Sequence, residues 1–212
     1  MRTIEKGTAP RSLTEYGQTP GATYDGFDGK EELRQALVRE QRGLCCYCQS
    51  RIRPEFGRMK IEHWRCQANY PGEALAYANL LSACMGGEGQ RFQAQHCDTR
   101  KGDRDLTRSP TNPAHRVGEL VRYLGDGTIA SDDQDFQRDL NVILGLNLAV
   151  LKNNRKQVLA GFLLALGHRA ATRAQLKRWE RDWSGSGTAG DLRPYCQVVV
   201  YWLRKRLNRM VS

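Results

Sequence analysis

The spacing of apolar residues predicts helices in four parts of the chain. The first is expected over about 28–41, and a helix or helix pair is expected over 131–166. Two more are expected over 172–183 and 195–210, joined by a flexible Gly- and Ser-rich loop over 184–190. Helices therefore dominate the second half of the chain.

Local residues give these helices candidate ends and faces. Asp28 and Ser131 are candidate N-caps, because their side chains can accept a hydrogen bond from a first-turn amide. Leu33, Ala36 and Leu37 form the apolar stripe of the first helix. This pattern is typical of helices that cover a core on one side.

The rest of the chain predicts short elements and loops. Strands are expected over 59–64 and 80–83, a small helix from about Asp98, and a hairpin around 125–127. Residues 1–27 are rich in Gly and Pro and are expected to form an extended arm. The predicted fold class is therefore α+β, mostly α.

Composition narrows the class of protein. With 212 residues and 40% hydrophobic residues, the chain can bury a core. The most apolar stretch, 140–151, is interrupted by Asn141 and Asn147, so no membrane span is expected. The first residues contain no apolar signal region, and a cytoplasmic location is expected.

The formal charge of +10 is unevenly distributed. Residues 1–149 contain 20 Lys+Arg and 20 Asp+Glu, whereas residues 150–212 contain 13 Lys+Arg and three acidic residues. Such asymmetry indicates a surface that faces a polyanion, phosphates above all. The alternative is a solvated helical face, and charge alone does not separate the two.

Six of the seven cysteines lie between Cys45 and Cys97. In a reducing compartment such a cluster indicates metal binding more than disulfides. Four thiolates suit tetrahedral Zn²⁺, and a C-x-x-C pair can reach one ion from a tight turn. The predicted zinc ligands are Cys45, Cys48, Cys84 and Cys97.

Alternatives to this ligand set remain open. Twelve residues separate the second pair of cysteines, a long spacing for a zinc knuckle. His96 can replace Cys97, and Cys46 can replace Cys45 as ligands. The thiols can also be buried and inert, and Cys66 fits that description better than a ligand role.

Three polar motifs are interleaved with these cysteines. They are Glu62-His63 at the end of the first predicted strand, Asn79 before the second, and Asp98 with Lys101 in the segment C-D-T-R-K. In this order they resemble the HNH, or ββα-metal, nuclease family. The resemblance implies a small zinc-stapled ββα-metal core with a helix before it and a helical region after it.

A finer resemblance rests on the strings C-x-Y-C-Q-S-R-I, I-E-H-W-R and H-C-D-T-x-K-G-D. These are similar to the PtuB-like HNH subunits of Septu-type and retron-associated anti-phage systems. The resemblance implies a PtuA-like ATPase partner, and in retron systems a reverse transcriptase with its DNA. It divides the chain into an arm and helix (1–44), the nuclease core (45–110) and a basic helical region packed on that core (111–212).

Phosphodiester hydrolysis needs a base and a cation at the phosphate. His63, with an ordinary pKa of ~6.5, suits the general base. Glu62 and Asp98 are oxygen ligands suited to Mg²⁺ or Mn²⁺, and the resemblance gives Asn79 the role of orienting His63 or fixing the loop. Neighbouring strand residues point to opposite faces, so Glu62 and His63 can meet one phosphate only if the strand end twists.

Contacts with the nucleic acid are expected from three cations in the core, Arg65, Arg100 and Lys101. Lys101 can alternatively brace the site. The substrate can be DNA or RNA, including tRNA. The alternative function is a non-catalytic zinc module that docks nucleic acid or a protein. The sequence contains no ATP-binding P-loop.

Overall fold

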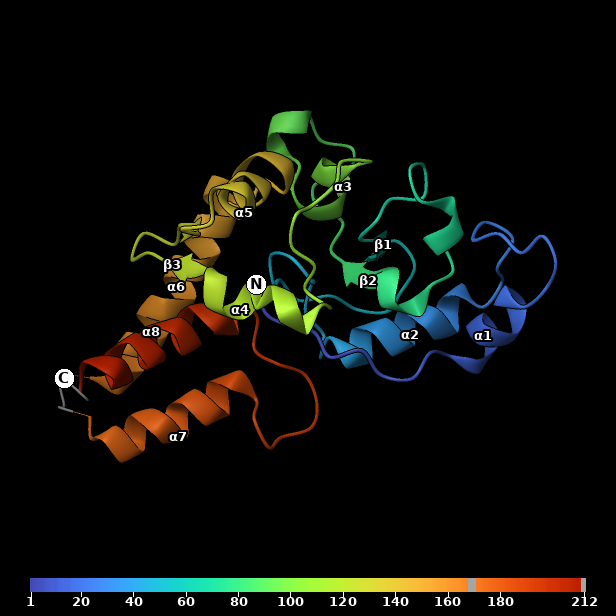
Figure 1. Ribbon diagram of the computed structural model, residues 1–212. Helices are drawn as coiled ribbons and strands as arrows, with labels where there is room; N and C mark the ends of the chain where they lie inside the picture. Colours follow the sequence, from blue (N-terminus) through green and yellow to red (C-terminus); the bar gives the residue numbers. More distant parts are fainter. Residues whose placement is uncertain (168–170, 211–212) are drawn as a thin grey trace.

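The computed structural model describes residues 1–167 and 171–210 (Figure 1). Across these residues the protein is mostly helical, with two small antiparallel sheets, as the sequence predicts. The α-helices are α1 (Arg11–Gly17), α2 (Lys30–Glu40), α3 (Cys97–Lys101), α4 (Val117–Leu120), α5 (Gln134–Arg138), α6 (Ala149–Leu166), α7 (Arg173–Ser184) and α8 (Cys196–Arg209). The strands are β1 (Lys60–His63), β2 (Leu80–Ala83), β3 (Arg122–Tyr123) and β4 (Ile129–Ala130).

Five short helical turns connect these elements. Four are 3-10 turns and the last is a π-helical turn: η1 (Pro71–Glu73), η2 (Tyr77–Asn79), η3 (Phe92–Ala94), η4 (Pro113–His115) and η5 (Asp139–Ile143). None of the helices in the described ranges is both long and apolar enough to cross a membrane.

The pair β1–β2 carries the residues of interest. The two strands are antiparallel, with Glu62 opposite Leu81 and His63 opposite Leu80. Every residue of β2 is buried, whereas only the last two residues of β1 are buried. This places the end of β1, and its polar side chains, inside the protein. The second sheet, β3–β4, is the hairpin expected around 125–127.

The helix α2 packs against β2 through the stripe that the sequence predicts. Leu33 and Leu37 of that stripe are fully buried, Ala36 is half-buried, and Val38 packs into the larger core that also contains the cysteines. The predicted cap at Asp28 is wrong, because the N-cap is Gly29 and no side chain caps the helix. Glu31 and Glu32 in the first turn still stabilise the start of the helix, because their negative charges interact favourably with the helix dipole.

The first 27 residues are not only an extended arm, because they contain α1. This helix is only seven residues long, and Leu13 is its buried residue. Leu13 and Phe27 form a small core with Leu33, Leu37 and Leu80. The arm therefore packs onto α2 and β2, at the end of the molecule opposite α7 (Figure 1).

The segment 131–166 forms a pair of helices, which is one of the two arrangements predicted from the sequence. The predicted cap at Ser131 is wrong, since the Asp133 side chain accepts the hydrogen bond from the Phe136 amide. The Ser131 hydroxyl instead accepts from the Asp133 amide, at 3.2 Å. The first helix continues into η5, and the second, α6, ends before Gly167.

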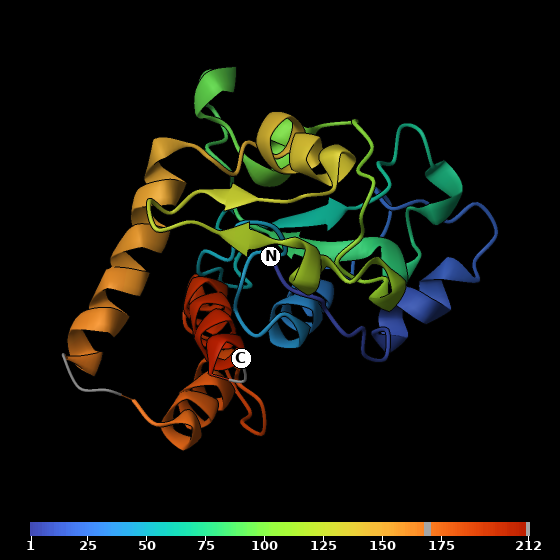
Figure 2. The same ribbon diagram turned by 60° about the vertical axis from the view of Figure 1, so that its left-hand side comes forward.

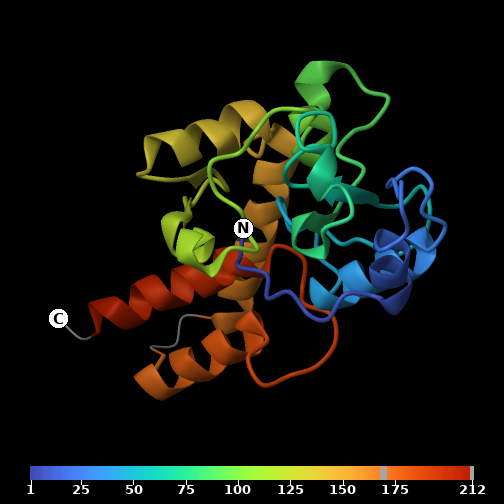
Figure 3. The same cartoon turned by 45° about the vertical axis from the view of Figure 1, so that its right-hand side comes forward.

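The last two helices pack closely on each other and form one end of the molecule (Figures 2 and 3). Thr172 and Gln175 form a capping box at the start of α7. The helix α6 also packs on α8. One buried core joins this region to the cysteine-rich segment, since it contains Tyr47 and Cys97 together with Leu140 and Val199.

Candidate metal centre and catalytic cavity

The sulfur atoms of the four predicted zinc ligands lie together. Cys45 and Cys97 have their sulfurs 3.8 Å apart, and Cys48 and Cys84 have theirs 3.7 Å apart. All four sulfurs lie within 4.8 Å of one another. Cys84 is partly exposed and the other three are buried. The cluster therefore sits just beneath the surface, with one thiol at its rim.

Backbone geometry brings the two halves of this cluster together. The Gln49 amide donates to the Cys45 carbonyl at 3.1 Å and closes the turn that carries the first pair. The His96 amide donates to the Gly86 carbonyl at 2.8 Å. A Cβ atom on Gly86 would lie 2.2 Å from the His96 carbonyl oxygen, so only glycine lets Cys84 approach Cys97 in this way.

The geometry fits a tetrahedral metal ion. Zinc–sulfur bonds of about 2.3 Å give a tetrahedron with sulfur–sulfur edges of about 3.8 Å, matching the observed pairs. A disulfide would need about 2.05 Å. Burial raises the pKa of the Cys45 thiol, but hydrogen bonds from surrounding thiols outweigh it and lower that pKa, whereas hydrogen bonds and burial raise the pKa of Cys84 and Cys97 well above the usual value. The four cysteines can therefore hold a metal ion such as zinc.

The alternative ligands take other positions. Cys46 is buried but lies outside the group of converging sulfurs. The Nδ1 atom of His96 lies 3.2 Å from the Cys97 sulfur and 3.9 Å from the Cys84 sulfur, at the rim of the cluster. Cys66 donates to the Asp103 carbonyl at 3.3 Å, away from the other sulfurs. The predicted set of four is thus the one that the structure brings together.

A separate cavity of about 770 Å³ is lined by three of the four predicted catalytic residues. Glu62, His63 and Asp98 all line it, and so does Lys101. Glu62 and His63 both reach this one space, although they are neighbours on β1. Asn79 is buried and does not line the cavity.

Glu62 is held by two buried donors. The Tyr47 hydroxyl donates to its Oε1 at 2.6 Å, and the Lys101 ammonium lies 3.0 Å from the same oxygen. Burial raises the pKa of Glu62 well above its usual value, and the neighbouring carboxyl of Asp98 raises it further, against the charge of Lys101. One carboxyl oxygen of Glu62 is therefore fixed by two donors, and Asp98 is its closest acidic neighbour.

His63 has a defined ring orientation. Its Nε2 atom lies 3.0 Å from the carbonyl oxygen of Ala74, which can only accept, so Nε2 carries the proton. The ring of Tyr24 contacts it edge-on, with centroids 4.4 Å apart. Burial lowers the pKa of His63, against the hydrogen bond to Ala74. The neutral tautomer with a free Nδ1 is favoured.

Asn79 ties down the loop that follows β1. Its Oδ1 accepts from the Arg65 amide at 2.8 Å, and its Nδ2 donates to the carbonyls of Arg65 and Glu73 at 3.0 and 3.1 Å. Ala74, the acceptor for His63, directly follows Glu73. Of the two roles expected for Asn79, this geometry matches fixing the loop, and it orients His63 only indirectly.

Asp98 reaches the cavity from α3. Its Oδ2 is 3.6 Å from the ammonium of Lys60, which also pairs with Glu88 at 2.8 Å. Two carboxylates, supplemented by phosphate and water, match the way Mg²⁺ binds in many phosphoryl-transfer sites. In the described residues, only the cysteine cluster unites three or more metal-binding side chains within ion-holding distance.

The three cations expected to contact nucleic acid are differently placed. Lys101 is buried, and its ammonium also donates to the His63 carbonyl at 2.9 Å, which corresponds to bracing the site. Arg65 pairs with Glu73 at 2.5 Å. The Arg100 guanidinium donates to the backbone carbonyls of Phe92 and Val142. Neither arginine lines the cavity.

From the sequence alone no role was assigned to Tyr47, Tyr24 or Glu88, which surround these groups. Tyr47 carried a usable signal, because it lies inside the C-x-x-C turn that the metal prediction rests on. Tyr24 carried none, since it lies in a Gly-rich segment with no motif around it.

Comparison with known proteins gives one informative similarity. The chain is similar to the Septu protein PtuB of Bacillus thuringiensis. The two are 28% identical over 82 residues, which are 39% of this chain and 28% of PtuB. The chain thus matches less than a third of the length of this curated relative. No family model matches the chain.

Proposed function

We propose that this protein is a metal-dependent HNH endonuclease that hydrolyses phosphodiester bonds in DNA or RNA. The observation that carries the proposal is the cavity shared by Glu62, His63 and Asp98, next to a separate four-cysteine cluster. The order β1, β2, α3, with the motifs at those positions, corresponds to the ββα-metal arrangement that the sequence resembles.

In this proposal His63 is the general base. Its Nε2–H is committed to the Ala74 carbonyl, so Nδ1 is free to take a proton from the attacking water. Because burial lowers the pKa of His63, the ring is neutral and ready to accept that proton near pH 7. Tyr24 holds the ring edge-on and limits its rotation.

Glu62 and Asp98 are the proposed ligands of a divalent cation such as Mg²⁺ or Mn²⁺. When bound, this ion would polarise the scissile phosphate and stabilise the leaving oxygen. Burial and the neighbouring Asp98 carboxyl raise the pKa of Glu62, so a positive charge placed beside the two carboxyls would be favoured. Tyr47 and Lys101 hold one oxygen of Glu62 and leave the other directed into the cavity.

We further propose that the enzyme acts in anti-phage defence, with a PtuA-like ATPase as partner and, in a retron-associated system, a reverse transcriptase with its DNA. The similarity to a Septu protein supports this setting. The division into an arm (1–44), a nuclease core (45–110) and a basic helical region (111–212) belongs to the same proposal.

The test is cleavage of plasmid DNA and of total RNA in Mn²⁺, by the wild type and by His63→Ala, with and without an ATPase partner. The proposal predicts that His63→Ala loses cleavage while its zinc content and circular dichroism match the wild type. His115→Gln is the matched control, because His115 lies outside the cavity and should retain activity.

The second candidate function is a non-catalytic zinc module that binds nucleic acid or protein. The sulfur cluster favours it, since such a cluster can serve structure alone. Release of zinc by His63→Ala, or no cleavage by the wild type with or without the partner, would reject the nuclease proposal in favour of this one. Equal cleavage by His63→Ala and His115→Gln would reject His63 as the general base.

A further inference from the structure

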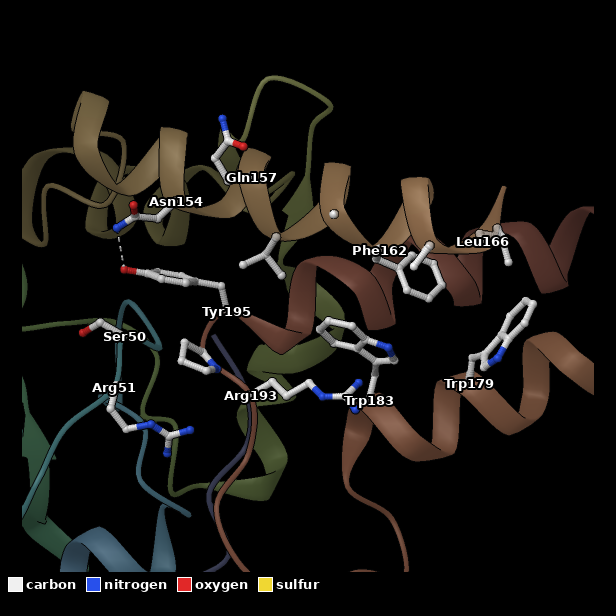
Figure 4. A pocket seen from close by; sticks show the side chains of 14 residues that line it. Ser50, Arg51, Asn154, Gln157, Phe162, Leu166, Trp179, Trp183, Arg193 and Tyr195 are labelled. Carbon is white, nitrogen blue, oxygen red and sulfur yellow. Dashed lines mark hydrogen bonds between the residues drawn. The ribbon is translucent and has the colours of Figure 1, made fainter. Parts of the chain in front are cut away.

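A groove of about 880 Å³ lies between α6 and α7, away from the catalytic cavity (Figure 4). The helix α6 forms one wall, Trp179 and Trp183 of α7 form the other, and Tyr195 closes one end, where its hydroxyl accepts a hydrogen bond from Asn154 at 3.0 Å. Both helices pack on α8.

We propose that this groove is the docking site for an acidic amphipathic helix of a partner protein. The size of the groove fits one row of side chains from a docked helix. Residues 154–166 of α6 line it, a length of about 18 Å at 1.5 Å per residue. A volume of about 880 Å³ over that length gives a channel roughly 7 Å wide, too narrow for a whole helix of 10–12 Å. Side chains at i, i+4 and i+7 of a docked helix would fill it.

The aromatic rings favour a protein partner over a nucleic acid. The ring of Phe162 meets Trp183 at 80° and Trp179 at 82°, with centroids 5.5 and 6.2 Å apart. Rings that meet edge to face leave no parallel slot for a base. The Arg193 guanidinium covers the Trp183 ring at 4.6 Å, so base stacking there would have to displace it. Trp and Arg in an apolar groove are instead typical of protein hot spots.

Charge favours an acidic partner. Residues 150–212 carry 13 Lys+Arg and three acidic residues. Two of those acids are already paired, Glu180 with Arg204 at 2.7 Å and Asp191 with Arg51 at 3.0 Å. Arg193 is exposed at the groove, and no carboxylate in the described part of the chain pairs with it. An acidic helix would supply the missing counter-charge.

Gly161 offers a direct way to fill the groove without disturbing the fold. It lines the groove, and a Cβ atom placed on it meets no atom within 4 Å. Leucine also favours a helix more than glycine does, so Gly161→Leu should fold normally. Ala160→Leu is the matched control, because Ala160 is exposed on the same helix and outside the groove.

The experiment is selection of a random peptide library, displayed on phage, against the full-length wild-type protein. Enriched peptides should carry Leu, Phe or Trp at i, i+4 and i+7 with Asp or Glu between them. Synthetic copies should bind about tenfold or more weakly to Gly161→Leu and to Arg193→Glu, and equally well to Ala160→Leu.

Three outcomes would overturn the proposal. The first is no enrichment, or enrichment of basic peptides. The second is binding that Gly161→Leu and Ala160→Leu affect equally. The third is a labelled single-stranded oligonucleotide whose binding is lost in Gly161→Leu but retained in Ala160→Leu, which would assign the groove to nucleic acid. The binding readout does not depend on nuclease activity, so a failure here leaves the proposed function untouched.

Discussion

The hydroxyl of Tyr47 donates a 2.6 Å hydrogen bond to the carboxylate of Glu62, and both side chains are buried. Tyr47 lies in the turn between Cys45 and Cys48, whose sulfurs belong to the metal cluster. The cysteine cluster and the cavity are therefore joined through one side chain. A change in the Cys45–Cys48 turn would therefore move Glu62, the proposed ligand of the divalent cation.

Replacement of Tyr47 by Phe removes this hydrogen bond and keeps the buried ring. We expect cleavage to fall about tenfold, since a charged hydrogen bond is typically worth about 1.5–3 kcal/mol. Zinc content should be unchanged. Rates of plasmid cleavage across a Mn²⁺ titration measure the effect, and the half-maximal rate should need a higher Mn²⁺ concentration than in the wild type.

Tyr77→Phe provides the matched control. It removes a similar bond, from the Tyr77 hydroxyl to Glu40 at 3.2 Å, outside the cavity. If both variants lose activity to the same extent, Tyr47 has no special role in positioning Glu62.

Lys101 and Glu62 form a buried ion pair at 3.0 Å, with both side chains almost fully shielded from solvent. Lys101→Met keeps the length of the side chain and removes its charge. We expect unfolding by urea to become easier by about 3 kcal/mol, because removing one partner leaves the other buried without its counter-charge.

Adding Glu62→Gln to Lys101→Met should restore part of that loss. The double mutant cycle measures the coupling between the two side chains in the free energy of unfolding. Simple addition of the two single effects, within about 0.5 kcal/mol, would mean that the pair does not stabilise the site.

The elements around the site could be read from local patterns. The strand β2 has the predicted bounds, 80–83, because four apolar or small residues between turn signals leave little choice. The seven-residue α1 was missed, since a single buried residue, Leu13, leaves no periodic stripe. The cap at Ser131 was wrong because Asp133, two residues later, competes for the same helix start.

The contacts within the site could not be read in the same way. The four cysteines could be recognised as metal ligands from their residue type and spacing. Their convergence could be predicted because a zinc ion needs four ligands around one point. The partners of Glu62 and His63 depend on tertiary packing, which brings Tyr24 from the arm and Ala74 from the loop. The charge of Lys101 suggested a contact with a phosphate of the substrate. In the structure Lys101 is buried and its ammonium pairs with Glu62.

The cysteine cluster predicts one zinc ion per chain. Cys48→Ala should lower the zinc content measured by plasma mass spectrometry and reduce the melting temperature by on the order of 10 °C, because a structural metal contributes directly to folding. Cys196→Ala removes a buried thiol outside the cluster and should keep the zinc. Equal zinc content in the two variants would contradict the assignment of the ligands.

Asn79→Ala should destabilise the protein by about 2–4 kcal/mol, since three hydrogen bonds to the loop backbone are lost in a buried place. Cleavage should fall as well, because the loop carries the acceptor for His63. Urea unfolding and cleavage rates provide the readouts.

Asn69→Ala is the comparison for this variant. Its Nδ2 donates to the Asp103 carbonyl at 3.1 Å in an exposed position, so its loss should cost less than about 0.5 kcal/mol. If Asn79→Ala is equally mild, Asn79 does not fix the loop.

The most direct test of the central claim is anomalous diffraction from crystals grown with zinc and soaked in Mn²⁺, recorded at the absorption edges of both metals. Two distinct sites are predicted: a zinc peak among the sulfurs of the four cysteines and a manganese peak between Glu62 and Asp98, beside His63. Manganese absent from the cavity, or zinc bound by His63 in place of the sulfurs, would contradict the account.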